Sequence, residues 1–472
     1  MSRVEKERDE MVVEVKQYVI HEVQGDMMTP ISIFSSLKGK HKVLFESSAK
    51  HEESGRYSFI AVNPIAELKG NNEEYTAQYV NEEPQKEKGS VLLKLKEMMP
   101  IQNGDYPFSF FGGAIGYFGY DTAFYNEKIG ESLKDDLNMP DVHVFFYDNF
   151  IVFDHLLQKV TIVAIDLFNN GRSEEEMQNI VKQIEKEITQ SIPFTDEEAV
   201  AVKFQPTIEK QQFIEMVETA KEHIEKGDIF QVVLSQRFKA PFEGNPFSLY
   251  RKLRTSNPSP YMFYVEFDEY TILGTSPESL VKVQNRIVTT NPIAGTKPRG
   301  KTKEEDNQIE QLLLNDEKEI AEHRMLVDLG RNDIGRVSKI GSVQVSKYMT
   351  IERYKHVMHI VSEVTGELHD DVHVLDVLTS CLPAGTVSGA PKIRAMQIIN
   401  NLEQTKRGVY AGAIGYISSN GNMDLALAIR TMIVKDQHAY VQAGAGVVYD
   451  SIPQSEYEET LNKAKALLEV QR

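Results

Sequence analysis

The stretch "HVFFYDNFIVFD" at residues 143–154 represents the N-terminal third of the chain, where short apolar runs alternate with clusters of turn-forming residues. The runs "KVLFESS" at 42–48 and "RYSFIAVNP" at 56–64 have the same form. Short runs rich in aromatic and β-branched residues between turn signals are typical of β-strands. The sequence therefore predicts a mostly antiparallel sheet with few helices over residues 15–165.

The composition becomes acidic and polar between residues 171 and 202, and this part of the chain includes Pro193. Such a stretch is typical of a surface helix followed by a linker. We therefore place a helix and linker at residues 166–204. They separate an N-terminal sheet domain at 15–165 from a second domain at 205–468.

The second domain is expected to mix strands with long helices. Its first strand is predicted in "DIFQVVLSQRF" at 228–238, and long helices are predicted at about 302–330 and 388–402. The pair Asn420-Gly421 lies between two strand-like runs, and this dipeptide is a strong signal for a tight hairpin turn.

The composition restricts the class of protein. The formal net charge is −18, which argues against nucleic acid as a partner because no basic stripe exists to contact phosphates. No run of about 18 apolar residues occurs, so no membrane span is predicted. The N-terminus "MSRVEKERDEMVVEVK" is too charged for a secretory signal, and the single cysteine, Cys381, excludes an internal disulfide. We expect a cytoplasmic protein.

Two predicted helices, at 315–330 and 453–470, carry acids on their apolar faces when each residue is placed 100° after the last. A buried carboxylate needs a partner or a metal ion. Oxygen ligands with no Cys or His cluster nearby suit Mg²⁺. Alternatively, the acids are partly solvated or meet Lys or Arg. The four inward-facing acids are Glu319, Glu322, Glu456 and Glu459.

Three further features favour a small carboxylated anion as the ligand. The run Gly444-Ala445-Gly446 ends a predicted strand and can form an anion-binding nest, although a bulge or tight sheet corner gives the same pattern. Arg430 lies in an apolar strand and needs a carboxylate partner, from a substrate or from the protein. Thr386 precedes a predicted helix, whose N-terminus attracts anions.

Eight motifs in a fixed order resemble the chorismate-utilising enzymes, and most of all the large subunits of anthranilate synthase. The motifs are "PIAGT", "EHRMLVDLGRND", "MHIVSEV", "LPAGTVSGAPK", "YAGAIGY", "AIRT", "QAGAGVVYDSIPQSEYEET" and "NKA". The resemblance is strong over 205–465 and looser in the N-terminal part, through "LFESS" and "RYSF". It implies an α/β fold of the α+β type, with two interleaved domains built on large antiparallel sheets packed face to face and helices outside. The N-terminal domain would be regulatory and the second domain would bind chorismate.

The resemblance also implies roles for particular residues. Relatives hold a Mg²⁺ that binds the ring carboxylate of chorismate and assists departure of the C4 hydroxyl. Its ligands here would be Glu322 and Glu459, with Glu319 and Glu456 around them. Glu278 would be the acid that assists loss of the C4 hydroxyl, and Thr386 is a further catalytic candidate. The residues expected to hold the substrate are Gly295, Thr296, Tyr410, Arg430, Gly444, Ala445, Gly446 and Lys463.

Three positions indicate the reaction within this group. Relatives that add water to chorismate resemble one another in having a lysine base where this chain has Gln231, which cannot deprotonate water. Aminodeoxychorismate synthases have a lysine in place of Ala294, and that lysine attacks C2. With a methyl group there, ammonia can add at C2 directly. His359 matches the residue associated with loss of pyruvate, so the expected product is anthranilate.

The resemblance implies two partners besides chorismate. Ammonia would come from a separate glutaminase subunit in a hetero-oligomer, because Cys381 lacks the glycine-rich surroundings of an amidotransferase nucleophile. L-tryptophan would be a feedback inhibitor bound by "LFESS" and "NPSPYM". Its expected contacts are Glu46, Ser47, Pro260, Tyr261 and Met262. The alternatives are an aminodeoxychorismate synthase, or a non-catalytic regulator that binds chorismate or tryptophan.

Overall fold

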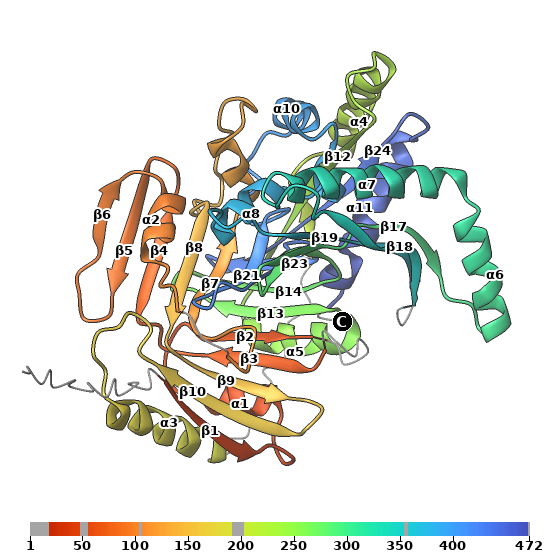
Figure 1. Cartoon of the computed structure of the whole chain (residues 1–472). Coiled ribbons are helices and arrows are strands. Elements are labelled where there is room, and N and C mark those ends of the chain that lie inside the picture. Colours follow the sequence, from red (N-terminus) through yellow and green to blue (C-terminus); the bar gives the residue numbers. More distant parts are fainter. Residues whose placement is uncertain (1–17, 48–54, 103–105, 191–202, 354–356, 471–472) are drawn as a thin grey trace, which may run out of the picture.

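A computed structural model describes residues 18–47, 55–102, 106–190, 203–353 and 357–470. Within these ranges the chain forms two twelve-stranded sheets with helices around them (Figure 1). The largest buried cluster contains side chains from both sheets, and the hydroxyls of Tyr117 and Tyr270 meet across them at 3.1 Å. No helix in the described part of the chain is long and apolar enough to cross a membrane.

The first sheet has its strands in the order β1-β10-β9-β3-β2-β13-β14-β23-β24-β12-β11, with β20 beside β12. Its strands are β1 (Tyr18–Gln24), β2 (Val43–Glu46), β3 (Tyr57–Ala61), β9 (Asn149–Asp154), β10 (Lys159–Ile165), β11 (Gln205–Pro206), β12 (Gln231–Pro241), β13 (Tyr261–Glu266), β14 (Tyr270–Ser276), β20 (Gly389–Ala390), β23 (Thr431–Lys435) and β24 (His438–Val447).

The second sheet has the order β17-β19-β16-β15-β22-β21-β7-β8-β4-β5-β6, with β18 beside β19. Its strands are β4 (Ala66–Gly70), β5 (Glu74–Tyr79), β6 (Gln85–Lys88), β7 (Gly113–Phe118), β8 (Val142–Tyr147), β15 (Ser279–Gln284), β16 (Ile287–Thr290), β17 (Ile293–Pro298), β18 (Gln344–Arg353), β19 (Val357–Glu367), β21 (Ala413–Ser418) and β22 (Met423–Leu427).

Both sheets combine strands from the two halves of the chain. In the first sheet β2 pairs antiparallel with β13, and in the second β7 pairs antiparallel with β21. Two interleaved units on large antiparallel sheets were predicted, and this fold class is confirmed. The domain limits at 15–165, 166–204 and 205–468 remain a prediction.

The stretch at 143–154 passes from one sheet to the other, because β8 belongs to the second sheet and β9 to the first. Every residue of β8 is buried, as is nearly all of β9, which explains the continuous apolar sequence. Asp148 lies at the crossover, 1% exposed, and its carboxylate is ion-paired with Arg172. The charge is therefore tolerated because it has a cation partner.

Helices cover the sheets on their outer sides and ends. The helices are α1 (Pro30–Ser36), α2 (Val91–Met98), the 3₁₀ helix η1 (Tyr120–Tyr125), α3 (Glu174–Thr189), α4 (Lys210–Glu225), α5 (Pro246–Ser256), α6 (Lys303–Leu314), α7 (Glu317–Gly335), α8 (Val374–Cys381), α9 (Gly385–Ser388), α10 (Lys392–Leu402) and α11 (Pro453–Leu468). The predicted surface helix is α3, whereas the linker expected at 191–202 lies outside the described residues.

The predicted helix at 302–330 is two helices, α6 and α7. The break falls at Asn315 and Asp316, because the Asp316 side chain accepts a hydrogen bond from the backbone N–H of Glu319 and so caps α7. The helix expected at 388–402 begins later, at Lys392, since residues 389–390 form the short strand β20. The hairpin at Asn420-Gly421 joins β21 to β22 as predicted.

Candidate active site

Helix α7 presents its acids toward the protein interior. His323, Leu326 and Val327 are buried, whereas Arg324 and Asp328 on the other side are exposed. Glu319 and Glu322 lie on the border of the buried face and are half-buried. Burial raises the pKa of Glu319, and the neighbouring charge of Glu322 raises it further. The helical-wheel prediction for these acids is confirmed.

Helix α11 buries one of its two acids that were predicted to face inward. Glu456 is 9% exposed, and its Oε2 has no hydrogen-bond partner among the described residues. Burial raises the pKa of Glu456, and a hydrogen bond with Ser451 partly opposes this effect. Glu459 is half-exposed and pairs with the ammonium of Lys463 at 2.7 Å, whereas Glu458 points to solvent.

The charge of one lysine acts on acids of both helices. The ammonium of Lys318 on α7 lowers the pKa of both Glu319 and Glu456, so α11 begins close to α7. The Gln231 Nε2 donates to Glu322 Oε1 at 2.9 Å, and the same nitrogen lies 2.9 Å from the place a Cβ on Gly446 would take. Glu322 therefore lies at the end of β24, immediately before α11.

The predicted pyruvate-elimination residue lies on β19, opposite the "PIAGT" strand β17. His359 Nδ1 and Thr296 Oγ1 are 2.9 Å apart. Gly295 forms a bulge with φ +72°, and a Cβ there would lie 3.3 Å from Glu319 Oε2. Burial lowers the pKa of His359, a hydrogen bond from the imidazole to the backbone of Gly295 opposes this effect, and the charge of Arg430 lowers the pKa further. His359 is therefore close to both Glu319 and Arg430.

A buried carboxyl group occupies the other side of the site. Burial raises the pKa of Glu278 to about 7, although a hydrogen bond from Thr386 and the charges of Lys463 and Arg430 act in the opposite direction. Thr386 Oγ1 donates this bond to Glu278 Oε1 at 2.8 Å. Arg430 has a left-handed backbone with φ +47°, a conformation that is costly for a residue with a side chain and is common at functional sites.

The glycines of β24 adopt a different backbone from the predicted one. Gly444, Ala445 and Gly446 pair with β12 in an unbroken antiparallel register, and none of the three has a positive φ. The predicted nest is therefore wrong, because a nest needs alternating right- and left-handed residues. The glycines instead leave space for side chains, since a Cβ on Gly444 would lie 2.7 Å from the Tyr410 hydroxyl. Lys463 Nζ also donates to Gly444 O at 3.2 Å.

These contacts form one continuous series. It runs from Glu459 through Lys463 and Gly444 to Tyr410, and from Lys463 through Glu278 and Arg430 to His359. It continues through Gly295 and Glu319 to Glu322 and Gln231. The structure thus brings together the residues predicted to be catalytic, substrate-binding and metal-binding, although they are more than 200 positions apart in sequence.

The five residues predicted to bind tryptophan meet elsewhere, where β2 pairs with β13. Glu46 lies opposite Met262 in this register, but its carboxylate already accepts bonds from Arg254 at 2.7 and 2.8 Å and from Tyr250 at 2.7 Å. Pro260 is half-buried, and Tyr261 bonds to Asp424. The Ser47 hydroxyl is buried and has no hydrogen-bond partner among the described residues, and Ser48 lies outside them.

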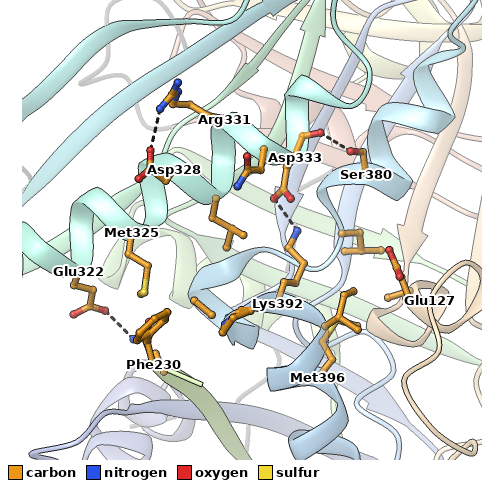
Figure 2. A pocket seen from close by; sticks show the side chains of 18 of the residues that line it. Glu127, Phe230, Glu322, Met325, Asp328, Arg331, Asp333, Ser380, Lys392 and Met396 are labelled. Atoms are coloured by element: carbon orange, nitrogen blue, oxygen red, sulfur yellow. Dashed lines mark hydrogen bonds and ion pairs between the residues drawn. The ribbon is translucent and has the colours of Figure 1, made fainter. Parts of the chain in front are cut away.

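A groove of about 1220 Å³ borders the site and was missed at the level of sequence (Figure 2). It shares Gln231, Lys318 and Glu322 with the acid cluster, and extends along α7 toward α10. On its floor Lys392 Nζ donates to Asp333 Oδ2 at 2.7 Å. Both residues lie within quoted motifs, but nothing in the sequence indicated that they pair.

Comparison with known proteins identifies the class. A family model described as chorismate binding enzyme matches residues 40–469, and the chain belongs to this family. Its similar relatives include the anthranilate synthase component 1 of Lactococcus lactis, 47% identical over 96% of this chain and 99% of the relative. That of Acetivibrio thermocellus is 48% identical over 98% and 97%.

Solved structures agree with this assignment. Anthranilate synthase component I from Streptococcus pneumoniae superposes with a TM-score of 0.81 at 48% identity, covering 95% of this chain and 99% of the other. The menaquinone-specific isochorismate synthase MenF of Escherichia coli gives a TM-score of 0.72 at 18% identity, which shows a shared fold alone. The resemblance inferred from the eight motifs is therefore confirmed.

Proposed function

We propose that this chain converts chorismate to anthranilate, the reaction named by its relatives, as a step in tryptophan biosynthesis. The observation that carries the proposal is one site in which Glu319 and Glu322 of α7 lie beside Gln231 and the "PIAGT" strand, with His359 paired to Thr296 of that strand. The same strand carries Ala294, which is 9% exposed and offers no nucleophile.

The acids offer the carboxylate oxygens that Mg²⁺ prefers. Within the described residues no group of three or more His, Cys, Asp or Glu side chains is arranged to hold a metal alone. Mg²⁺ suits such a site because it keeps waters and takes further oxygen ligands from a substrate. The unpartnered Glu456 Oε2 is an oxygen that a bound water or ion would satisfy. We propose that Glu322 and Glu459 hold the ion, with Glu319 and Glu456 orienting its waters. When bound, it would polarise the ring carboxylate and C4 hydroxyl of chorismate.

The protein's own groups account for amination at C2. Because burial raises its pKa to about 7, Glu278 can hold a proton near neutral pH and deliver it to the departing C4 hydroxyl. Thr386 fixes the orientation of that carboxyl group. Because Ala294 ends in a methyl group, C2 stays open to ammonia. We propose that Arg430, Lys463 and Tyr410 bind the carboxylates and the enolpyruvyl group of the substrate.

Loss of pyruvate then needs a base at C2. Burial lowers the pKa of His359, which favours the neutral imidazole, and the Thr296 hydroxyl 2.9 Å from Nδ1 orients the ring. We propose that this neutral imidazole accepts the C2 proton. Departure of the enolpyruvyl oxygen from C3 makes the ring aromatic. Gln231 cannot take a proton from water, so hydroxylation at C2 is not expected.

The ammonia would come from a second component, as the name component 1 of the relatives implies. We propose a glutaminase subunit, since Cys381 is 3% exposed and burial raises the pKa of its thiol far above the usual value. We also propose feedback inhibition by tryptophan bound where β2 meets β13, with residues 15–165 as the regulatory domain. The Ser47 hydroxyl, which has no hydrogen-bond partner among the described residues, supports this assignment.

Direct assay tests the proposal. The purified chain is mixed with chorismate, Mg²⁺ and an ammonium salt, and anthranilate fluorescence and pyruvate are followed together. The expected result is equal amounts of the two products. Formation of a 4-amino product without pyruvate would favour an aminodeoxychorismate synthase, and absence of turnover would favour a non-catalytic chorismate-binding regulator.

A further inference from the structure

Arg407 is among the largest fully buried side chains of the described chain, with 2% exposure. It lies in the polar segment between α10 and β21, outside the residues assigned above to substrate or metal. Its guanidinium forms a bidentate pair with Glu403, with Nε to Oε2 at 2.8 Å and Nη2 to Oε1 at 2.6 Å. Burial alone would lower the pKa of Arg407, but Glu403 raises it above its usual value, so the group stays charged.

The remaining donors of Arg407 hold the backbone of two segments of the site. Nη1 donates to Val387 O at 2.7 Å, and Val387 follows Thr386 directly on α9. Nη2 donates to Val233 O at 2.7 Å, and Val233 lies on β12 two positions after Gln231. One planar group thus ties the strand that contacts Glu322 to the turn that contacts Glu278.

Two more contacts extend this arrangement. The guanidinium lies over the ring of Tyr410 at 5.6 Å from its centroid, and the hydroxyl of Tyr410 faces Gly444. Glu403 Oε1 also accepts hydrogen bonds from the backbone N–H and the hydroxyl of Ser235, both at 2.9 Å. The pair is therefore hydrogen-bonded to β12 at two residues, Val233 and Ser235. Ser235 lies opposite Gly444 in the ladder of β12 and β24.

We propose that the Arg407–Glu403 pair is a positioning unit for the chorismate site, fixing β12, α9 and Tyr410 relative to one another while touching no substrate atom. This inference rests on the proposed function. Arginine suits the role because its rigid fork presents five donors in one plane. A lysine ammonium would keep the charge beside Glu403 but could not reach both carbonyl oxygens.

The test compares Arg407→Lys with Arg172→Lys, which alters the ion pair between the partly exposed Arg172 and the buried Asp148. Each enzyme is assayed with saturating Mg²⁺ and ammonium below its unfolding temperature. We expect kcat of Arg407→Lys to fall by at least about tenfold, since a misplacement near 1 Å can cost about a hundredfold. The midpoint of its pH profile should also move upward, because Thr386 would no longer be held on Glu278. Arg172→Lys should leave both quantities unchanged.

Glu403→Gln provides a second variant, because it keeps the shape and an acceptor oxygen but removes the charge. Its kcat should also fall and its pH midpoint should also move upward, but both changes should be smaller than those of Arg407→Lys. The proposal is overturned if folded Arg407→Lys or Glu403→Gln keeps the wild-type kcat and pH midpoint, or if neither variant folds. Failure of the proposed function is a different result, because wild-type protein would then form no anthranilate.

Discussion

Replacing Thr386 by valine removes the hydroxyl that donates to Glu278 Oε1 at 2.8 Å while keeping a similar shape. A hydrogen bond to a charged group contributes about 1.5–3 kcal/mol. One pKa unit corresponds to about 1.4 kcal/mol, so losing the bond to the carboxylate should raise the pKa of Glu278 by about one to two units. The wild-type pKa is about 7, so that of the variant should lie near 8 to 9.

The assay is kcat against pH at saturating chorismate and Mg²⁺. The concentration of free ammonia must be held constant by adjusting total ammonium, because deprotonation of ammonium would otherwise mask the loss of the Glu278 proton. The activity of the wild type should fall as pH rises through about 7, and that of Thr386→Val only at higher pH. Thr161→Val, a buried threonine change on β10, is the control and should keep the wild-type midpoint. If the midpoint of Thr386→Val is unchanged or lower, Glu278 is not the acid held by Thr386.

Three further predictions concern stability, elimination and control. Burial raises the pKa of Glu278 from 4.5 to about 7. The protonated carboxyl group therefore stabilises the folded protein fully below pH 4.5, and this stabilisation, about 3 kcal/mol, is lost as the pH rises through about 7. Glu278→Gln should therefore abolish turnover. It should raise the free energy of unfolding, measured in urea, more at pH 8 than at pH 4. An equal change at both pH values would refute the raised pKa of Glu278. His359→Met should slow pyruvate release and let an aminated intermediate accumulate in rapid-quench chromatography, whereas anthranilate formed at the wild-type rate would remove His359 from this role. Ser47→Phe should place a bulky ring at the proposed effector site, where the Ser47 hydroxyl has no partner among the described residues, and so relieve tryptophan inhibition with little change in basal activity. Persisting inhibition would place the effector elsewhere.

The side of α7 and α11 on which each acid lies could be predicted from the sequence because helical periodicity is a local property. Placing residues at 100° intervals directed Glu319, Glu322, Glu456 and Glu459 inward and Glu458 outward. The structure buries Glu456, half-buries Glu319 and Glu322 and exposes Glu458, but it leaves the Glu459 side chain 45% exposed. The motifs then assigned the remaining site residues, and the structure brings them together. Local periodicity could not show that β2 pairs with β13, or β7 with β21, because register depends on partners far away in the chain.

Other features depend on tertiary context. The anion-binding nest considered at Gly444–Gly446 does not form, because pairing with β12 imposes an extended backbone. The sequence alone permits left-handed residues there, since glycine adopts them readily. The Arg407–Glu403 pair lies in "NLEQTKRG", where charged residues are indistinguishable from a solvated surface loop. The Asp333–Lys392 pair beside the groove likewise depends on the packing of α7 against the start of α10.

Titration with Mn²⁺ tests the central claim that acids from α7 and α11 hold one divalent ion. Electron paramagnetic resonance would measure free Mn²⁺ against full-length protein with chorismate present. Wild type should bind one ion per chain, and Glu322→Gln and Glu459→Gln should each weaken binding by at least about tenfold. The exposed neighbour Glu458, changed to Gln, should bind as wild type does. If Glu322→Gln or Glu459→Gln binds Mn²⁺ as tightly as Glu458→Gln, the two helices do not share a metal ion.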